Sequence, residues 1–405
     1  MTNVSDVLCE DAGGLWAESP RAGIPAQCRS VSTPKGCAVD QQRGLFVCLA
    51  SVLIGFGLLM VHSASATSWP SEMEQVHLFQ HLLFLGIGIC GLCACAYLPA
   101  RFWYHASPAL FAATIALLVL VLIPSIGTRV NGGQRWLRFR SWSVQPSEIA
   151  KVTMILFLCR LIQNRRENLS RWFHGTVPFL LPLVIVVLLV FRQPDLGTAA
   201  FLFMSGAITL FIAGWPIRNF VLGLAAAVPA AVYGLALKPY QLRRITGFMA
   251  MWTDSDQAPY QLKQSLLSLG VGGLNGIGLG RGWQKLSFLP EANTDFVFAV
   301  VGEELGLLGT LSLLLLWIGM YFSGLRILSQ LPQPSFCRIA GIALLTQLAV
   351  QAALHVAVVT ALIPPKGIAH PLLSYGGSNL VMSMVALGIV LSLSRADPER
   401  DAHIL

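Results

Sequence analysis

The sequence predicts an all-α protein that crosses a membrane about ten times, and three observations support this prediction. Hydrophobic residues make up 55% of the 405 residues and charged residues only 11%, with a mean hydropathy of +0.67. Soluble domains carry roughly 25% charged residues. Apolar runs close to the ~20 residues that a spanning helix needs recur along the whole chain. We therefore expect one polytopic membrane domain.

The elements follow in chain order. Residues 1–44 are polar and lack the apolar core of a signal peptide, which predicts a flexible cytoplasmic tail. The predicted spanning helices are 45–65, 78–98, 106–124, 145–162, 176–191, 198–215, 219–237, 296–322, 337–362 and 371–394. A large extracytoplasmic loop, 238–295, separates the seventh helix from the eighth, and 395–405 form a C-terminal cytoplasmic tail. The membrane domain thus covers 45–394.

Charge gives the orientation and a first indication of a ligand. An even number of spans places both termini on one side, which we take as the cytoplasm, although Lys and Arg divide almost evenly between the two sides. Outside charges gather in the loops 125–144 and 238–295. This predicts an anionic ligand on the outer face, or else simple solvation of long loops. The net charge of +8 does not indicate nucleic acid, because no aromatic residues interleave with the basic ones.

Two polar clusters lie in the first half of the membrane domain. Gln145, Pro146, Ser147 and Glu148 begin a helix, with proline in the first turn and an acid at the positive end. Lys151 follows Glu148 by three residues, so we expect an ion pair between them, with a role in a binding site as the alternative. Asp195, in the segment QPDLGTA, is predicted to cap the next helix.

Two further clusters lie in the second half. The glycine-rich segment 270–280 follows no strand, which argues against a dinucleotide fingerprint and favours a hinge where backbone approaches a ligand. In PPKGIAHPLLSYGGSNL, 364–380, prolines prevent a regular helix around the isolated Lys366. Broken backbone at membrane depth must line a cavity or be buried in protein. Ser374 and Ser378 are candidates to present hydroxyls to an anion, unless the segment is simply a re-entrant turn.

The segment LPEANTDFVFAVVGEELG, 289–306, runs from a Pro-Glu turn into an apolar region that contains three carboxylates, Asp295, Glu303 and Glu304. Asp295 is a candidate helix cap, with Thr294 as its rival, or a functional residue. Glu303 and Glu304 lie further in, where carboxylates are costly and usually face the bundle interior with a function. Together with the glycine-rich loop and Lys366, these residues predict a site for an anionic amphiphile.

These motifs, in this order, resemble those of the SEDS proteins (shape, elongation, division and sporulation) over about residues 45–394. The resemblance implies a ten-helix peptidoglycan glycosyltransferase that polymerises lipid II on the outer face of the bacterial inner membrane. It also implies partners: the growing glycan strand, a class B penicillin-binding protein that cross-links the product, and other divisome membrane proteins. The motif variants favour the division type, FtsW-like, with the elongation type, RodA-like, as the alternative. Departures from the family pattern include Asn293, His355, Ala361 and His370.

The resemblance also assigns roles to residues. Asp295 matches the family's essential aspartate, and we expect it to deprotonate the acceptor's 4-hydroxyl as that oxygen attacks the donor's anomeric carbon with inversion. One carboxylate suffices because a lipid diphosphate leaves without a proton. The predicted diphosphate ligands are Lys366, Arg135, Arg243, Arg244, Lys285, Ser374 and Ser378. The predicted supporting polar residues are Gln145, Glu148, Lys151, Asp195, Glu303 and Glu304.

Three points stay open at this stage. A divalent cation, Mg²⁺ or Mn²⁺, is a candidate cofactor, with no residues assigned to hold it. A lipid II flippase is the main alternative function, and it predicts no dependence on Asp295 as a base. A scaffold that only docks a penicillin-binding protein is the third, but it leaves the cost of the buried Glu303 and Glu304 without a purpose.

Overall fold

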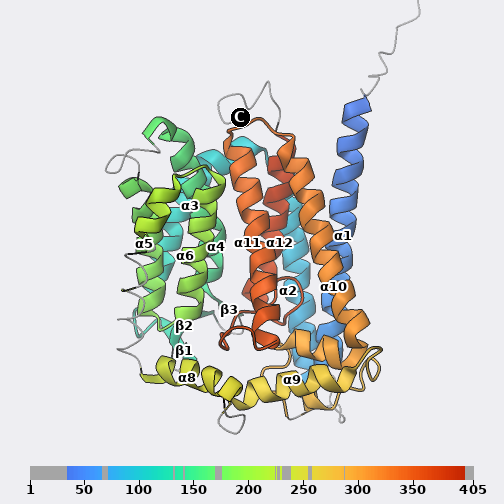
Figure 1. Ribbon diagram of the computed structural model, residues 1–405. Coiled ribbons are helices and arrows are strands. Elements are labelled where there is room, and N and C mark those ends of the chain that lie inside the picture. Colours follow the sequence, from blue (N-terminus) through green and yellow to red (C-terminus); the bar gives the residue numbers. More distant parts are fainter. Residues whose placement is uncertain are drawn as a thin grey trace, which may run out of the picture.

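Long α-helices standing side by side dominate the computed structural model (Figure 1). It describes residues 34–65, 72–130, 133–139, 142–168, 176–223, 225, 229, 239–253, 258–286 and 288–396. The helices are α1 (Pro34–Ser65), α2 (Glu72–Tyr97), α3 (Ala100–Leu120), α4 (Pro146–Asn164), α5 (Val177–Arg192), α6 (Leu196–Ile212), α8 (Pro239–Thr253), α9 (Tyr260–Gly272), α10 (Val297–Ser329), α11 (Phe336–Val359) and α12 (Gly377–Ser394). The shorter elements are β1 (Gly127–Val130), β2 (Gly133–Phe139), β3 (Trp142–Val144), η1 (Arg166–Asn168) and η4 (Gln284–Leu286).

Every predicted spanning segment overlaps one of these helices except the seventh, 219–237, which lies largely outside the described residues. The prediction of a tail up to residue 44 is wrong at its end, because α1 already begins at Pro34. Proline fits the first turn of a helix, and adding residues to a formed helix costs little. The remainder of the tail, and residues 397–405, lie outside the described residues.

The helices pack in pairs that are distant in sequence. α1 lies along α10, and α2 lies along α12. The second pair approaches closely because Gly388 has no side chain: a Cβ there would lie 2.4 Å from the Leu92 carbonyl oxygen. Arg43, near the start of α1, donates a hydrogen bond to the Ser394 carbonyl at 2.6 Å. The first and last described helices therefore begin and end at the same end of the bundle (Figure 1).

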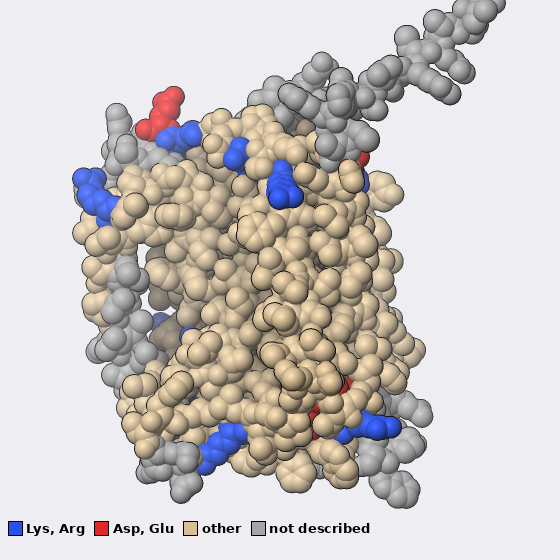
Figure 2. Space-filling view, turned by 45° about the vertical axis from the view of Figure 1, so that its right-hand side comes forward, with Lys and Arg blue, Asp and Glu red and all other residues tan. Residues whose placement is uncertain are grey.

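The composition of the helices is that of a multi-pass membrane protein. Among the described residues, six helices are long and apolar enough to span a bilayer, and α5 and α6 are shorter apolar helices. α4 is mostly buried inside the bundle, which accommodates its charged residues. In the face shown in Figure 2, Lys, Arg, Asp and Glu gather at the two ends, and uncharged residues cover most of the band between them.

At the end of the bundle opposite the described termini, the segments that we predicted as loops contain secondary structure. β1, β2 and β3 form an antiparallel sheet in that order, which corrects the all-α prediction in this detail. Within β2 the buried Leu137 is followed by the exposed Arg138, as expected in a strand, where successive side chains point to opposite faces. α8 and α9 lie across the same end of the bundle (Figure 1). The Ser265 hydroxyl on α9 donates to the Val359 carbonyl of α11 at 2.7 Å.

The glycine-rich segment packs against α10, where that helix is broken. Gly306 has a φ of 66°, which interrupts the helix after two turns. Backbone groups released by the break bond to the glycine-rich segment: Ile277 N–H donates to the Glu303 carbonyl at 3.0 Å, and Leu307 N–H donates to the Gly273 carbonyl at 2.9 Å. The glycines thus let this backbone approach α10, in place of the ligand contact that we expected.

Candidate active site

Asp295 lies in the turn before α10, against the loop Pro364–Gly376, which we call the PPKG loop. A Cβ on Gly367 would lie 3.0 Å from Asp295 Oδ2. The capping alternative for Asp295 is wrong, because Phe296 occupies the cap position of α10 and no side chain bonds there. The side chain is half-buried, and among the described residues none donates a hydrogen bond to its carboxylate.

The surroundings of Asp295 favour a protonated carboxyl. Burial, with smaller contributions from the carboxylates of Glu291 and Asp195, raises its pKa to about 7, and the Arg244 guanidinium opposes that shift. A carboxylate with a pKa near neutrality, exposed enough to be reached and not engaged with protein donors, has the properties of a general base.

Lys366 directly precedes Gly367, the glycine that lies against the Asp295 carboxylate. The aliphatic part of the Lys366 side chain packs against Gly197. A Cβ added to Gly197 would lie 3.5 Å from Lys366 Cβ and 3.8 Å from Asp195 Oδ1. Lys366 is half-buried, and burial lowers its pKa. Within the described part of the chain, its ammonium group makes no ion pair and no hydrogen bond. An ammonium group held in this way is ready to receive an anion.

Asp195 and Arg135 join the sheet to the start of α6. Asp195 caps α6 as predicted, accepting a hydrogen bond from Thr198 N–H at 3.1 Å. Arg135 on β2 lies 3.4 Å from the other oxygen of Asp195 and donates to the Pro194 carbonyl at 2.5 Å. Its guanidinium is therefore engaged with protein groups, which leaves it less suited to the predicted diphosphate contact.

Hydroxyl groups fasten the PPKG loop and α12 to neighbouring motifs. Ser374 Oγ donates to the Thr294 carbonyl at 2.5 Å, directly before Asp295 in the chain. Ser378 Oγ donates to the Ser143 carbonyl at 3.3 Å and accepts from Gln145 N–H at 3.1 Å. We predicted that Ser374 and Ser378 present hydroxyls to an anion. The structure uses both to hold motifs together, because the backbone groups of these irregular segments need partners.

A buried polar chain connects α4 to the PPKG loop. Lys151 Nζ lies 2.6 Å from a Glu148 oxygen, which confirms the predicted ion pair. The same ammonium donates to Gln351 Oε1 on α11 at 3.0 Å, and Gln351 Nε2 donates to the Ala369 carbonyl at 2.9 Å. Glu148 and Lys151 thus position the loop that carries Lys366. Sequence reasoning missed Gln351, although an amide within an apolar helix is a usable signal.

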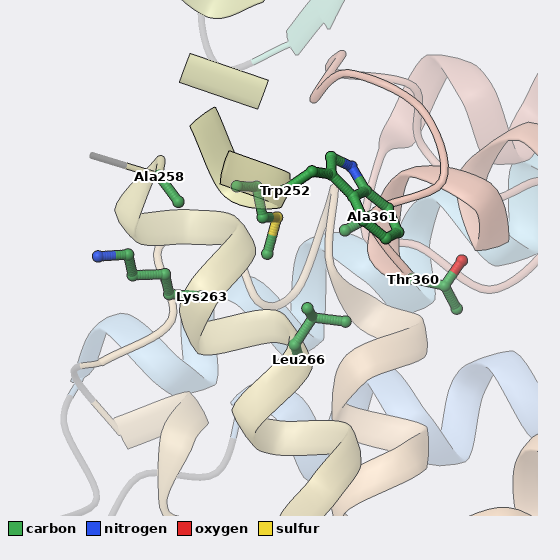
Figure 3. Close-up of a pocket in the computed structure, with 7 residues that line it drawn as sticks. Trp252, Ala258, Lys263, Leu266, Thr360 and Ala361 are labelled. Atoms are coloured by element: carbon green, nitrogen blue, oxygen red, sulfur yellow. The ribbon is translucent and has the colours of Figure 1, made fainter. Parts of the chain in front are cut away.

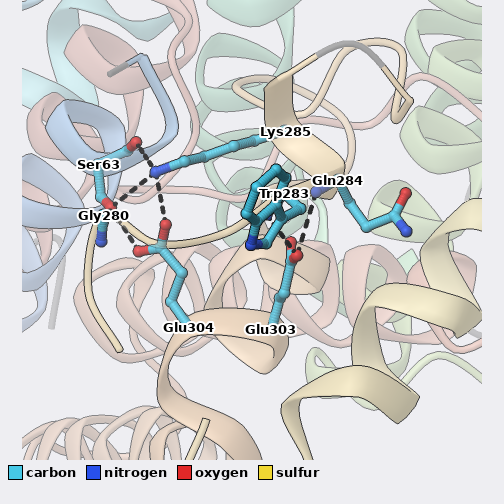
Figure 4. A network of polar contacts seen from close by, with 7 residues as sticks. All are labelled: Ser63, Gly280, Trp283, Gln284, Lys285, Glu303 and Glu304. Atoms are coloured by element: carbon cyan, nitrogen blue, oxygen red, sulfur yellow. Dashed lines mark hydrogen bonds and ion pairs between the residues drawn. The ribbon is translucent and has the colours of Figure 1, made fainter. Parts of the chain in front are cut away.

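Glu303 and Glu304 are fully buried and belong to a separate network (Figure 4). Lys285 Nζ lies 2.6 Å from Glu304 Oε1 and donates to the Ser63 carbonyl of α1 at 2.6 Å. Glu303 Oε1 accepts from Trp283 N–H at 2.7 Å. The Lys285 side chain is only 1% exposed, and its contacts hold η4 to α10 and α1. The structure contradicts its predicted role as a diphosphate ligand.

The remaining predicted cations are on α8. Arg244 is half-buried and close enough to Asp295 to affect its charge, whereas the side chain of Arg243 lies outside the described residues. In the described part of the chain, no three His, Cys, Asp or Glu side chains gather to hold a metal ion. Asp295 and Asp195 do not complete such a donor set, so we derive no step through a divalent cation.

Comparison with known proteins places these motifs in context. A family model described as "Cell cycle protein" (FtsW, RodA, SpoVE) matches residues 43–399. The chain is 35% identical over 349 residues to "Probable peptidoglycan glycosyltransferase FtsW" of Geobacter sp. (strain M18), covering 85% of this chain and 95% of that protein. It is 37% identical over 355 residues to "Stage V sporulation protein E" of Bacillus subtilis (strain 168), covering 87% and 96%.

Solved structures give the same result for the fold. A chain from work described as "Structural coordination of polymerization and crosslinking by a peptidoglycan synthase complex" superposes with a TM-score of 0.71 at 26% identity, covering 86% of this chain and 96% of that one. The rod shape determining protein RodA of Thermus thermophilus superposes with a TM-score of 0.64 at 26% identity, covering 86% and 95%.

Proposed function

Because this chain belongs to the FtsW, RodA and SpoVE family of cell cycle proteins, we propose that it is a peptidoglycan glycosyltransferase that polymerises lipid II. One observation carries the proposal: Asp295, a half-buried carboxylate with a pKa of about 7, lies against the PPKG loop, which carries Lys366, a cation without an ion pair among the described residues. A base and an anion-binding group side by side are what transfer of a sugar from a lipid diphosphate requires.

Each residue has one role in the reaction. Asp295 accepts the proton of the acceptor's 4-hydroxyl while that oxygen attacks the donor's anomeric carbon. The new carbon–oxygen bond forms as the bond to the lipid diphosphate breaks, and the diphosphate leaves with the electron pair. Lys366 neutralises the charge that develops on the leaving group, with Arg244 nearby, and the proton passes from Asp295 to water. A single displacement of this kind inverts the anomeric centre.

We place the active site on the outer face of the bacterial inner membrane. The sheet, α8 and α9 lie at the end of the bundle opposite the start of α1 and the end of α12 (Figure 1), which supports both termini being cytoplasmic. We further propose a class B penicillin-binding protein as partner, supported by the likeness to a chain of a peptidoglycan synthase complex. Relatives named FtsW favour a role in septal synthesis, and the likeness to RodA keeps an elongation role as the alternative.

Polymerisation of labelled lipid II by the purified chain tests the proposal, with and without a class B partner. Asp295→Asn is the test variant. Asp40→Asn is the matched control, because Asp40 is an exposed carboxylate on α1 at the opposite end of the bundle. Glycan chains from wild type and Asp40→Asn only would support Asp295 as the base. A folded, active Asp295→Asn protein would remove it from that role. Lipid II translocation in vesicles, without chains under any condition, would support the flippase.

A further inference from the structure

A pocket lies between α8, α9 and the end of α11 (Figure 3), and the reaction described above does not use it. Its volume is ≈ 520 Å³. Pockets that hold a drug-sized ligand measure about 300–1,000 Å³. The side chains on which the argument rests are Met251, Trp252, Lys263, Leu266, Thr360 and Ala361.

The pocket is a neighbour of the Asp295 site. Thr360 and Ala361 directly follow α11, a few residues before the PPKG loop. On α8, Trp252 follows Arg244 by eight residues, which is about 12 Å along a helix, and Arg244 acts on the charge of Asp295. If the anionic group of a bound molecule contacts Lys366 and Arg244, a short alkyl chain attached to that group is long enough to reach this pocket.

The walls suit hydrocarbon. Trp252, which is 70% exposed, lines the pocket together with Leu266 and Ala361 (Figure 3), and Met251 adds a flexible thioether. The Thr360 hydroxyl already donates to the Val356 carbonyl at 2.8 Å. Figure 3 shows the ammonium of Lys263 turned away from the indole, so that its alkyl stem forms the wall. A sugar ring needs several converging polar groups, and these walls do not offer them.

We propose that the pocket holds the isoprene units next to the diphosphate of the lipid-linked substrate, an inference that rests on the proposed function. The sugar must reach Asp295 and the diphosphate must reach Lys366, so the chain has to leave the site towards the bilayer. Branched alkyl units in contact with Trp252, Met251 and Leu266 remain out of water along that path, which favours binding.

Steady-state kinetics of Trp252→Ala test the contact with two substrates, lipid II with its full undecaprenyl chain and an analogue with a short prenyl chain. Trp283→Ala is the matched control, since Trp283 is an equally exposed indole (69%) outside the pocket. For the long-chain substrate we expect KM to rise about five- to tenfold with little change in kcat, as loss of a large apolar contact predicts. For the short-chain analogue the variant should behave like wild type.

An equal effect of Trp252→Ala on both substrates, or no effect in an active enzyme, would overturn the inference. One of these results is also expected if bulk phospholipid, rather than the substrate's own chain, fills the pocket. Photolabelling with a diazirine-bearing undecaprenyl phosphate does not depend on turnover. Label on the peptides of α8 and α9, reduced in Trp252→Ala and retained in Trp283→Ala, supports the pocket. Label found only on peptides of other segments would contradict it. Absence of polymerisation by wild type, by contrast, counts against the proposed function, and the labelling result then decides the pocket by itself.

Discussion

The pH dependence of polymerisation tests the role of Asp295 most directly. With a pKa of about 7, about a tenth of Asp295 is ionised at pH 6 and about nine tenths at pH 8, so kcat/KM should rise roughly tenfold between them. A carboxyl at its ordinary value of 3.8 would be ionised throughout and would give a flat profile. The assay is the initial rate of glycan formation from labelled lipid II, at subsaturating substrate, in buffers from about pH 5.5 to 8.5.

Two neighbouring variants should move the curve in opposite directions. Glu291→Gln removes a carboxylate that raises the pKa of Asp295, so the midpoint should shift to lower pH. Arg244→Gln removes the cation that lowers it, so the midpoint should shift to higher pH. A flat profile between about pH 6 and 8, or equal profiles for both variants, would refute the assignment of Asp295 as the titrating base.

The same shift has a consequence for stability. Since the folded state raises the pKa of Asp295, its protonated form stabilises the fold. That contribution is complete below pH 3.8 and is lost as the pH rises through about 7. Asp295→Asn, which stays neutral, should therefore melt at a higher temperature than wild type at pH 8 and at the same temperature at low pH. Thermal unfolding in detergent measures both, and a lower melting temperature at pH 8 would contradict the reasoning.

Three further substitutions test the packing. Lys285→Met leaves Glu304 as an uncompensated buried charge and should cost about 3–5 kcal/mol, seen as a lower melting temperature; the double variant Lys285→Met/Glu304→Gln should recover part of it, and no recovery would argue against the pair. Gly367→Ala places a methyl 3.0 Å from Asp295 Oδ2 and should lower kcat by about tenfold or more with an unchanged melting temperature. Gly306→Ala, at a φ of 66° and 2.4 Å from a backbone nitrogen, should cost about 1–3 kcal/mol or more, measured by thermal unfolding; a neutral result would mean that the helix break can relax.

The spanning helices could be predicted because their signal is local. About twenty apolar residues in a row need no partner to identify them, and the apolar stretches within α1, α10 and α12 stand out on composition alone. The cap role of Asp195 and the pair of Glu148 with Lys151 were also accessible, since each depends on neighbours three residues away. The strand β2 could not be predicted in this way, because its residues show no period-two pattern: Trp136 and Leu137 are adjacent, and an arginine flanks the pair on each side.

Other assignments failed because their partners are distant in the chain. Lys285 has the sequence context of a loop cation, and only the fold brings it onto Ser63 of α1, 222 residues away. Ser374 has the context of an anion ligand, and only the fold places the Thr294 carbonyl beside it. Charge and motif therefore identify which residues are unusual, whereas the three-dimensional structure decides which of them remain available to a substrate.

The broken helix α10 bears on how the chain enters the membrane during synthesis. On the two sides of the break at Gly306, the carbonyls of Glu303 and Glu304 and the N–H groups of Leu307 and Leu308 have their partners in the glycine-rich segment. In the hydrocarbon of a bilayer, leaving those groups without hydrogen-bond partners would be costly. The glycine-rich segment precedes α10 in the chain, so it is translated before α10. The partner of the break is thus already synthesised when α10 is made.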